Sequence, residues 1–566
     1  MSRASRLSSS VFLALALMAS ALPAVAQTSD PGTVETDGAD VVLPDMDSEV
    51  RGVQPRDVDA PLPPAPVLPL PASGPPLPPE AQLSIPESAY RTEATLDTSA
   101  RAALGETFTE ASVGAGLWDG VSAALSIYRP GADPSFSMTF AHDSTDGFAF
   151  RERGEGFYER RTALSGRVRG TLAGSSAWSL SASFADEADG LQGQSVDFYG
   201  VSHRYLDVLG SYTRPLGPLD LRVEMDAASA SRDLELAVEN PAGSLGTNEL
   251  ILSPRVALEF ERDIFYFSLE SDYRFLGLLG LGPDDEPEDR ATHRISADLV
   301  SRADVSSLLS LGAMLGVVSS SSSPLLVPFA LSLEAGLGPY VSLALDGGLA
   351  FDDGSLGEEW RDDPWLDVGG IPADDGRWNA NARIDLFPFP DLTARVGAAW
   401  ALSLPGSGRL VPELPAGATQ IARGLNTYRV EEYSTLESEF ALRWLIGGSA
   451  SIGIGWKADW FDPPVSGDAQ RLSLEAEYRG RDEAFGAALA ASAGLSSETF
   501  SAESLLGGSD TPKVDFNGFV RLSPEIRLIA DFRDILIAFA GPDGRPGFGL
   551  LLENGFQASV KLQISL

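Results

Sequence analysis

Residues Asn554 to Leu566 read NGFQASVKLQISL. From Phe556 onward every even position is apolar, and every odd position up to Ser565 is polar. Successive side chains of a β-strand point to opposite faces, so this stretch predicts a strand with one apolar and one polar face. The predicted strand runs to the last residue of the sequence.

The same two-faced pattern recurs from Phe108 to the end of the chain. Leu219, Leu221, Val223 and Met225, for example, alternate with Asp220, Arg222, Glu224 and Asp226. Counting such segments gives about 22 strands. A long series of two-faced strands behind an export signal favours an all-β fold, a transmembrane antiparallel up-and-down barrel whose apolar face meets lipid.

The connections between these strands alternate in length. One set is short, as at Arg262–Asp263, and the other is mostly long, as at Asp352–Gly376 and Ser403–Asn426. Outer-membrane barrels have short periplasmic turns and long outer loops. We therefore expect residues 106–566 to form an outer-membrane barrel of a Gram-negative-type bacterium. An even strand count places both termini in the periplasm.

Composition excludes several classes of protein. The net charge is −39 and the pI is about 4.3, which argues against nucleic-acid binding. The sequence has no cysteine, so it can form neither a disulfide nor a thiolate metal site. Only His142, His203 and His293 are available as imidazole ligands, far apart in sequence, so we expect no metal site and no cofactor.

The N-terminal residues divide into two predicted segments. Residues 1–26 have a positive start, a short apolar core and the cleavage pattern Ala24-Val25-Ala26, which indicates a secretory signal peptide. Residues 27–105 are acidic and then proline-rich, with ten prolines in the nineteen residues from Pro61 to Pro79. This composition favours a disordered periplasmic arm. The arm is either a plain tether or, within 27–80, a docking site for a periplasmic protein.

The two strand faces differ in chemistry as a membrane barrel requires. Aromatic residues on the apolar face suit the interfacial girdles: Trp178, Trp400, Trp444, Trp460 and Tyr478. An Arg or Lys facing lipid at the midplane would cost about 2–4 kcal/mol, so the charged face should line the lumen. The predicted lumen-lining residues are Arg167, Arg169, Glu259, Arg383, Asp385, Glu437, Glu439, Lys513 and Asp515.

The strand count, the predicted strand Ile526–Phe532, the loop Gly541–Gly547 and the final strand together resemble the C-terminal end of TonB-dependent receptors. The resemblance implies a channel or transporter for solutes. These receptors carry a globular plug domain ahead of the barrel, and the 27–105 segment does not suit one. We therefore expect a barrel without a plug, assembled by the barrel-assembly machinery and surrounded by outer-membrane lipid and lipopolysaccharide. A structural or adhesive barrel is an alternative.

A second resemblance suggests an enzyme. Phe140-Ala141-His142-Asp143-Ser144 is similar to the His-x-Ser stretch of outer-membrane phospholipase A, in which the His is the base and the Ser the nucleophile. His142 and Ser144 continue the apolar face of their predicted strand, and a neutral His beside a Ser could take its proton. The alternative function is therefore a lipid hydrolase, although transport without catalysis is the main expectation.

A 22-stranded barrel is wide, and something should narrow it. The loop Asp352–Gly376 has nine acidic residues together with Trp360 and Trp365. Tryptophans in an acidic outer loop are better placed against lumen charges, such as Arg383 and Arg395, than in water. We expect this loop to fold inward and to constrict the lumen.

Overall fold

The protein is described by a computed structural model, which covers residues 106–147, 156–172, 175–193, 198–236, 247–280, 290–321, 325–352, 354–362, 364–366, 375–413, 427–462, 470–480, 483–495, 512–537 and 555–565. The predicted signal peptide 1–26 and the predicted arm 27–105 lie outside these residues. Among the described residues, no helix is long and apolar enough to cross a membrane.

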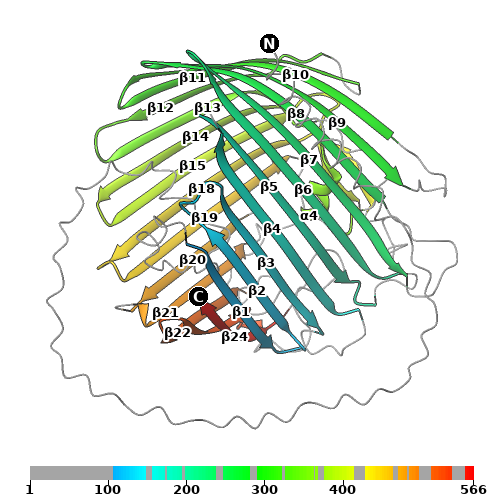
Figure 1. Cartoon of the computed structure of the whole chain (residues 1–566), viewed down its shortest axis with the longest axis vertical. Helices are drawn as coiled ribbons and strands as arrows, with labels where there is room; N and C mark the ends of the chain where they lie inside the picture. The colour runs from blue at the N-terminus through cyan, green and yellow to red at the C-terminus, as the bar shows by residue number, and fades with distance from the viewer. Residues whose placement is uncertain are drawn as a thin grey trace, which may run out of the picture. The chain divides into compact units, whose positions relative to one another are not determined.

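The described chain is built almost entirely of β-strands (Figure 1). The strands are β1 (Phe108–Gly116), β2 (Val121–Arg129), β3 (Ser135–Asp146), β4 (Tyr158–Leu172), β5 (Ser176–Gly190), β6 (Phe198–Leu216), β7 (Leu219–Leu236), β8 (Thr247–Arg262), β9 (Phe265–Gly280), β10 (Arg290–Ser306), β11 (Leu309–Ser320), β12 (Phe329–Gly336), β13 (Val341–Asp352), β14 (Asp375–Phe389), β15 (Leu392–Ser403), β16 (Arg409–Glu413), β17 (Thr427–Glu431), β18 (Ser434–Ile446), β19 (Ala450–Asp462), β20 (Gln470–Arg479), β21 (Phe485–Leu495), β22 (Lys513–Ser523), β23 (Ile526–Arg533) and β24 (Gln557–Ser565).

Twenty-two of these strands form one antiparallel sheet that closes on itself. Each strand pairs with its neighbour in sequence, and β1 pairs with β24, with Val113 opposite Leu562. Figure 1 shows these first and last strands side by side. Closure leaves no unpaired sheet edge, which is the condition for strands to cross a membrane. The predicted 22-stranded up-and-down barrel is confirmed.

Side chains reinforce the seam between β1 and β24. Gln563 Nε2 donates a hydrogen bond to Glu110 Oε1, and Ser565 Oγ donates to the same oxygen at 3.4 Å. In the turn after β1, the backbone N–H of Leu117 donates to the carbonyl of Ala558 at 2.8 Å, and Trp118 Nε1 donates to the carbonyl of Phe556 at 3.0 Å. The alternating C-terminal strand therefore joins the two ends of the sheet.

The two rims of the barrel carry different connections. At one rim the strands are joined by short turns, as by Asp263 and Ile264 between β8 and β9. The start of β1 and the end of β24 lie at this rim, because Glu110 pairs with Ser565 and Phe108 with Tyr128. The opposite rim carries most of the long connections, including residues 353–374 between β13 and β14.

The alternation of side chains separates an apolar outer face from a polar inner face. Large apolar side chains on one face stay exposed, including Leu315 at 56%, Trp444 at 52% and Val560 at 51%. Most of the residues that alternate with them are small, polar or charged. Exposed side chains of this size, in a continuous band on a closed barrel, suit contact with lipid.

Two elements of the long connections were not anticipated by the strand pattern. Residues Leu356–Asp362 form a short helix, α4, in the connection between β13 and β14. The connection between β15 and β18 contains the hairpin of β16 and β17, in which Val411 pairs with Arg429. Neither α4, which reads LGEEWRD, nor β16, which reads RLVPE, has two-faced alternation, so the pattern that predicts barrel strands does not reveal them.

Candidate functional site

Helix α4 folds into the barrel and packs against the inner faces of β6, β7, β8 and β9 (Figure 1). The contact is apolar. Trp360 is fully buried, and Leu356 and Leu366 are nearly so. They pack with wall residues from four strands: Tyr205, Ala230, Ile251, Leu276 and Leu278. Burying a side chain of this size in an otherwise polar lumen fixes the position of the loop on one sector of the wall.

The wall also caps the helix. Glu249 on β8 is 2% exposed, and its carboxylate accepts hydrogen bonds from the backbone N–H groups of Leu356 at 2.8 Å and Gly357 at 2.9 Å. The hydroxyl of Ser355 donates to it at 2.9 Å. A carboxylate at the start of a helix accepts hydrogen bonds from N–H groups that have no partner within the helix. Its negative charge also interacts favourably with the positive end of the helix dipole.

A second wall residue holds the far end of the same segment. The guanidinium of Arg232 on β7 donates to the carbonyl oxygen of Leu366 and lies 5.7 Å from the centre of the Trp360 ring. Trp365 packs against a separate group of buried residues, Leu191, Val201 and Leu234. The loop is thus held at its start by an anion, at its end by a cation, and between them by aromatic packing.

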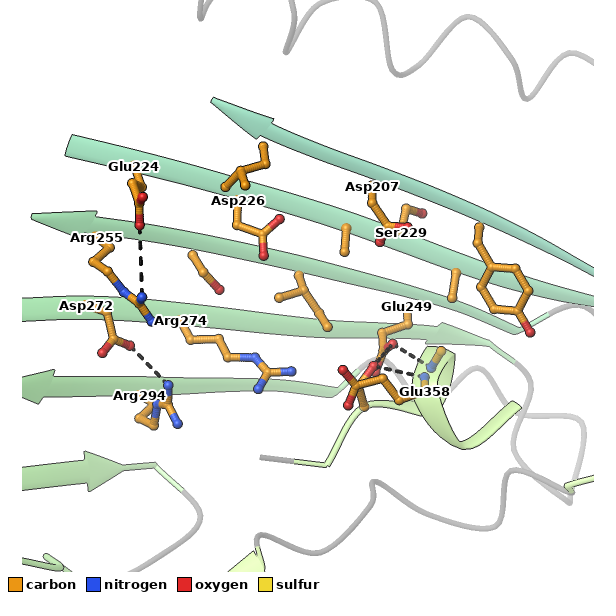
Figure 2. Close-up of a pocket in the computed structure, with 18 of the residues that line it drawn as sticks. Asp207, Glu224, Asp226, Ser229, Glu249, Arg255, Asp272, Arg274, Arg294 and Glu358 are labelled. Atoms are coloured by element: carbon orange, nitrogen blue, oxygen red, sulfur yellow. Dashed lines mark hydrogen bonds and ion pairs between the residues drawn. The ribbon is translucent and has the colours of Figure 1, made fainter. Parts of the chain in front are cut away.

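A cavity of about 440 Å³ lies between α4 and the inner wall of β6 to β10 (Figure 2). Charged side chains of neighbouring strands line it in pairs. Glu224 and Arg255 approach to 4.0 Å, and Asp272 and Arg294 to 3.1 Å. On the α4 side, Arg361 contacts Asp207 at 3.0 Å and lies over the ring of Tyr205. The space beside the helix is therefore polar, with charges of both signs.

The sequence-predicted lumen residues all lie on the face that carries α4, by strand register. Arg167 and Arg169 are on β4, Glu259 on β8, Arg383 and Asp385 on β14, Glu437 and Glu439 on β18, and Lys513 and Asp515 on β22. They are spread around the barrel and do not form one site.

Most of these charges have partners on the wall. Asp385 is almost fully buried and contacts Arg395 at 2.8 Å and Arg383 at 3.2 Å. Glu259 contacts Arg222 at 3.1 Å, and Glu437 contacts Lys457 at 3.3 Å. Arg383 and Arg395, which were expected to be among the lumen charges beside the tryptophans, both bind Asp385. Trp360 lies against Arg232.

His142 and Ser144 lie on the outer face of β3, two positions apart. The hydrogen bond of His142 is between its Nδ1 and the hydroxyl of Thr162 on β4, at 2.9 Å. In the register, Ser144 is opposite Val121 on one side and Arg160 on the other. The arrangement therefore pairs the His with a threonine of the neighbouring strand.

The described residues contain no group of three or more His, Asp or Glu side chains that could hold a metal ion. His203 is buried against Trp360 and Tyr205, with ring centres 5.6 and 6.1 Å away. His293 Nδ1 lies 2.7 Å from the hydroxyl of Tyr273. These imidazoles are parts of aromatic contacts on two different sectors of the barrel.

Sequence reasoning missed Glu249 and Arg232, the residues that hold α4. Nothing local marks them, because both continue the alternating strand pattern as ordinary inner-face charges. The only available signal was their setting: Ile251 and Leu234, two positions away on the same inner faces, are apolar where most inner-face positions are polar. An apolar interruption of the polar face indicates a surface that something covers.

No family model and no curated protein matches the sequence. Solved structures do match. The FrpB iron transporter from Neisseria meningitidis is 9% identical with a TM-score of 0.62, over 82% of this chain and 83% of that one. The copper transporter OprC is 11% identical with a TM-score of 0.60, over 81% and 80% of the two chains.

A mutant of the ferric enterobactin receptor PfeA from Pseudomonas aeruginosa is also similar. It is 11% identical with a TM-score of 0.59, over 82% of each chain. At these identities the likeness is one of fold. The 22-stranded barrel of this chain has the fold of these receptors and transporters, which confirms at the level of fold the predicted resemblance to TonB-dependent receptor barrels.

Proposed function

We propose that this protein is an outer-membrane channel or transporter for solutes, similar to a TonB-dependent receptor barrel without a plug domain. One observation carries the proposal: a closed barrel with an apolar outer face and a charged inner face has a loop helix docked on that inner face. Charges of both signs inside a barrel suit an aqueous path. The similar structures are described as an iron transporter, a copper transporter and a ferric enterobactin receptor, which supports a transport role.

In this proposal α4 and Trp365 narrow the lumen. The helix occupies the wall of β6 to β9, and its polar side faces the cavity with Glu358 and Arg361. A solute entering from the rim of long connections would pass between this helix and the remaining wall. The predicted lumen-lining charges Arg167, Arg169, Glu259, Arg383, Asp385, Glu437, Glu439, Lys513 and Asp515 then set the electrostatic character of the path.

The proposal includes a placement in the cell, which rests on the sequence for residues 1–105 and on the strand order for the barrel. Residues 1–26 direct export and are removed, and residues 27–105 form a periplasmic arm with a docking segment or tether in 27–80. Both termini are periplasmic, since the start of β1 and the end of β24 share the rim of short turns. The outer face contacts membrane lipid, and the long connections meet lipopolysaccharide.

Reconstitution of the purified barrel in a planar bilayer tests the proposal. Wild-type protein should give discrete conductance steps, and deletion of Leu356–Gly370 should increase the step size and the sensitivity of cells to large antibiotics. Heat-modifiable migration on gels establishes that the deletion variant still forms a barrel. A correctly folded wild-type barrel that conducts no ions and admits no solute into liposomes would favour a structural or adhesive barrel instead.

A further inference from the structure

The inner face of β4 carries two arginines that differ from most of the charged residues on the wall. Arg167 and Arg169 are two positions apart, so both point into the lumen. Neither lies within ion-pair distance of a carboxylate among the described residues. By contrast, Arg222, Arg294 and Arg395 on other sectors each contact an acidic side chain at 3.1, 3.1 and 2.8 Å.

The residues opposite the two arginines on the neighbouring strands are serines. Ser137 and Ser181 stand opposite Arg167 on the two neighbouring strands, and Ser135 and Ser179 stand opposite Arg169. The Nε of Arg169 donates to the hydroxyl oxygen of Ser135 at 3.1 Å, a neutral acceptor. Hydroxyl neighbours leave the positive charge of both guanidiniums uncompensated and can themselves donate hydrogen bonds to an anion.

A depression of about 240 Å³ in the inner wall lies at Arg167. It is lined by Ser137, Thr139, Ser165, Arg167, Ser181, Ser183, Asp207 and Leu209, together with Gly166 and Ala182. Arg167 and Asp207 are its charged residues. The Asp207 carboxylate already accepts hydrogen bonds from Arg361 of α4 at 3.0 Å and from Ser183 at 3.2 Å. Because Arg361 neutralises Asp207, the net charge of the depression is the positive charge of Arg167.

The turn next to the two arginines contains a carboxylate, Asp133, that binds Thr171. Asp133, between β2 and β3, accepts hydrogen bonds from the hydroxyl and from the backbone N–H of Thr171, the latter at 2.9 Å. These bonds hold the pKa of Asp133 below its usual value. Asp133 therefore remains charged near neutral pH, and it pairs with Thr171 rather than with Arg169.

The position along the lumen places the pair just beyond the constriction. Asp207, which α4 contacts, is level with Ser183 and Ser165 across the sheet. Arg167 lies two residues nearer the rim of short turns, and Arg169 lies two residues nearer still. A strand rises about 3.3 Å per residue, so the two side chains begin about 7 Å apart. A solute that has passed α4 meets them in succession.

We propose that Arg167 and Arg169 form a binding subsite for a solute that carries oxyanion groups, either phosphate or carboxylate. The subsite rests on the proposed function, because it requires solutes to enter the lumen. Guanidinium groups bind such oxyanions with two parallel hydrogen bonds. The spacing suits one anion at each arginine, or a single solute with two anionic groups. In a chain of net charge −39, this local positive charge admits solutes that the loops would repel.

Two measurements test the subsite, with inorganic phosphate and succinate as probes. Isothermal titration of the folded barrel in detergent at low ionic strength should show binding of one or both probes. The double variant Arg167→Gln/Arg169→Gln should bind about tenfold more weakly. In bilayers, the same probes should reduce wild-type conductance, and the double variant should lose this block and shift its selectivity toward cations.

The control is Arg160→Gln, an arginine on the same strand whose side chain points to the outer face. It should bind and conduct as the wild type does. The variant Arg167→Lys/Arg169→Lys keeps the charge but not the paired donors, and should fall between wild type and the glutamine variant. Equal binding by the wild type and the glutamine variant, or none by the wild type, overturns the subsite.

The two proposals fail separately. A barrel that conducts but is insensitive to both probes retains the proposed channel and loses the anion subsite. A barrel that binds phosphate through the arginines but passes no ions retains the subsite and loses the channel. Phosphate and succinate titrations with unequal affinities identify which oxyanion the subsite prefers.

Discussion

The carboxylate of Glu249 lies 2.8 Å from the backbone nitrogen of Leu356, a residue 107 positions later in the chain. This contact joins the barrel wall to the first turn of α4. A seven-residue helix is too short to be stable alone in water. Its stability must come from the wall, through the Glu249 carboxylate and the apolar surface around Trp360.

Replacing Glu249 should release α4 while leaving the barrel intact. Glu249→Ala removes the acceptor of two backbone N–H groups, and each buried donor left without a partner costs about 1–3 kcal/mol. Single-channel conductance should rise toward that of the loop deletion. Glu249→Gln keeps an amide oxygen as acceptor and should have a smaller effect. Glu475→Gln, on the inner face of β20 away from α4, serves as control, and equal conductance in all variants would contradict the capping role.

Trp360→Ala should undock the loop through lost packing. Truncating a fully buried aromatic side chain costs about 3–5 kcal/mol. Here the loss should weaken the docking of α4 and leave the stability of the barrel unchanged. The loop should become cleavable by added protease in intact cells, with no change in heat-modifiable migration. Trp378→Ala on β14, where the ring is 40% exposed, is the matched control and should leave the loop protected. Equal protection in both variants would show that Trp360 does not hold the loop.

The assignment of faces predicts opposite outcomes for two adjacent positions of β11. Leu315 is 56% exposed on the outer face, and Leu315→Arg at mid-strand should cost about 2–4 kcal/mol by placing a charge in lipid. Met314 points to the inner face, so Met314→Arg should cost little. The free energy of unfolding in urea, measured for both variants, tests the assignment of faces. Similar losses for the two would mean that the faces are wrongly assigned.

Ser144→Ala should leave the activity of the protein unchanged. The imidazole of His142 forms its hydrogen bond with Thr162, and a serine nucleophile needs a base within hydrogen-bond distance of its hydroxyl. The measurement is hydrolysis of fluorescent phospholipid by purified protein with calcium, beside conductance. A calcium-dependent phospholipase activity that disappears in this variant would establish the enzyme instead.

Removing residues 27 to 106 behind an intact signal peptide should still give a heat-modifiable barrel. The predicted arm is too rich in proline and acid to bury much apolar surface, and the first strand begins at Phe108. Fractionation with the outer membrane and the shift on heating are the measurements. Loss of assembly in the truncated protein would show that the arm takes part in folding.

The sequence alone determined the barrel, because its evidence is local and repeated. From Phe556 to Leu566 the alternation of apolar and polar residues predicts the face of each side chain. In β24, Leu562 lies opposite Leu528 on one neighbouring strand and Val113 on the other. Similar alternation in strand after strand allows only one closed arrangement in lipid. The approximate strand count and the inner-face position of charges such as Arg383 follow from the same period of two.

The tertiary structure alone decided how those charges are used. Arg167 and Arg383 read identically in sequence as inner-face arginines, yet Arg383 shares Asp385 with Arg395, whereas the residues opposite Arg167 on the neighbouring strands are Ser137 and Ser181. Pairing depends on which side chains the register of neighbouring strands brings opposite, and local sequence does not contain that register. The docking of Trp360 against Arg232 likewise depends on the position of a long loop. A complementary surface more than a hundred residues away in the chain fixes that position.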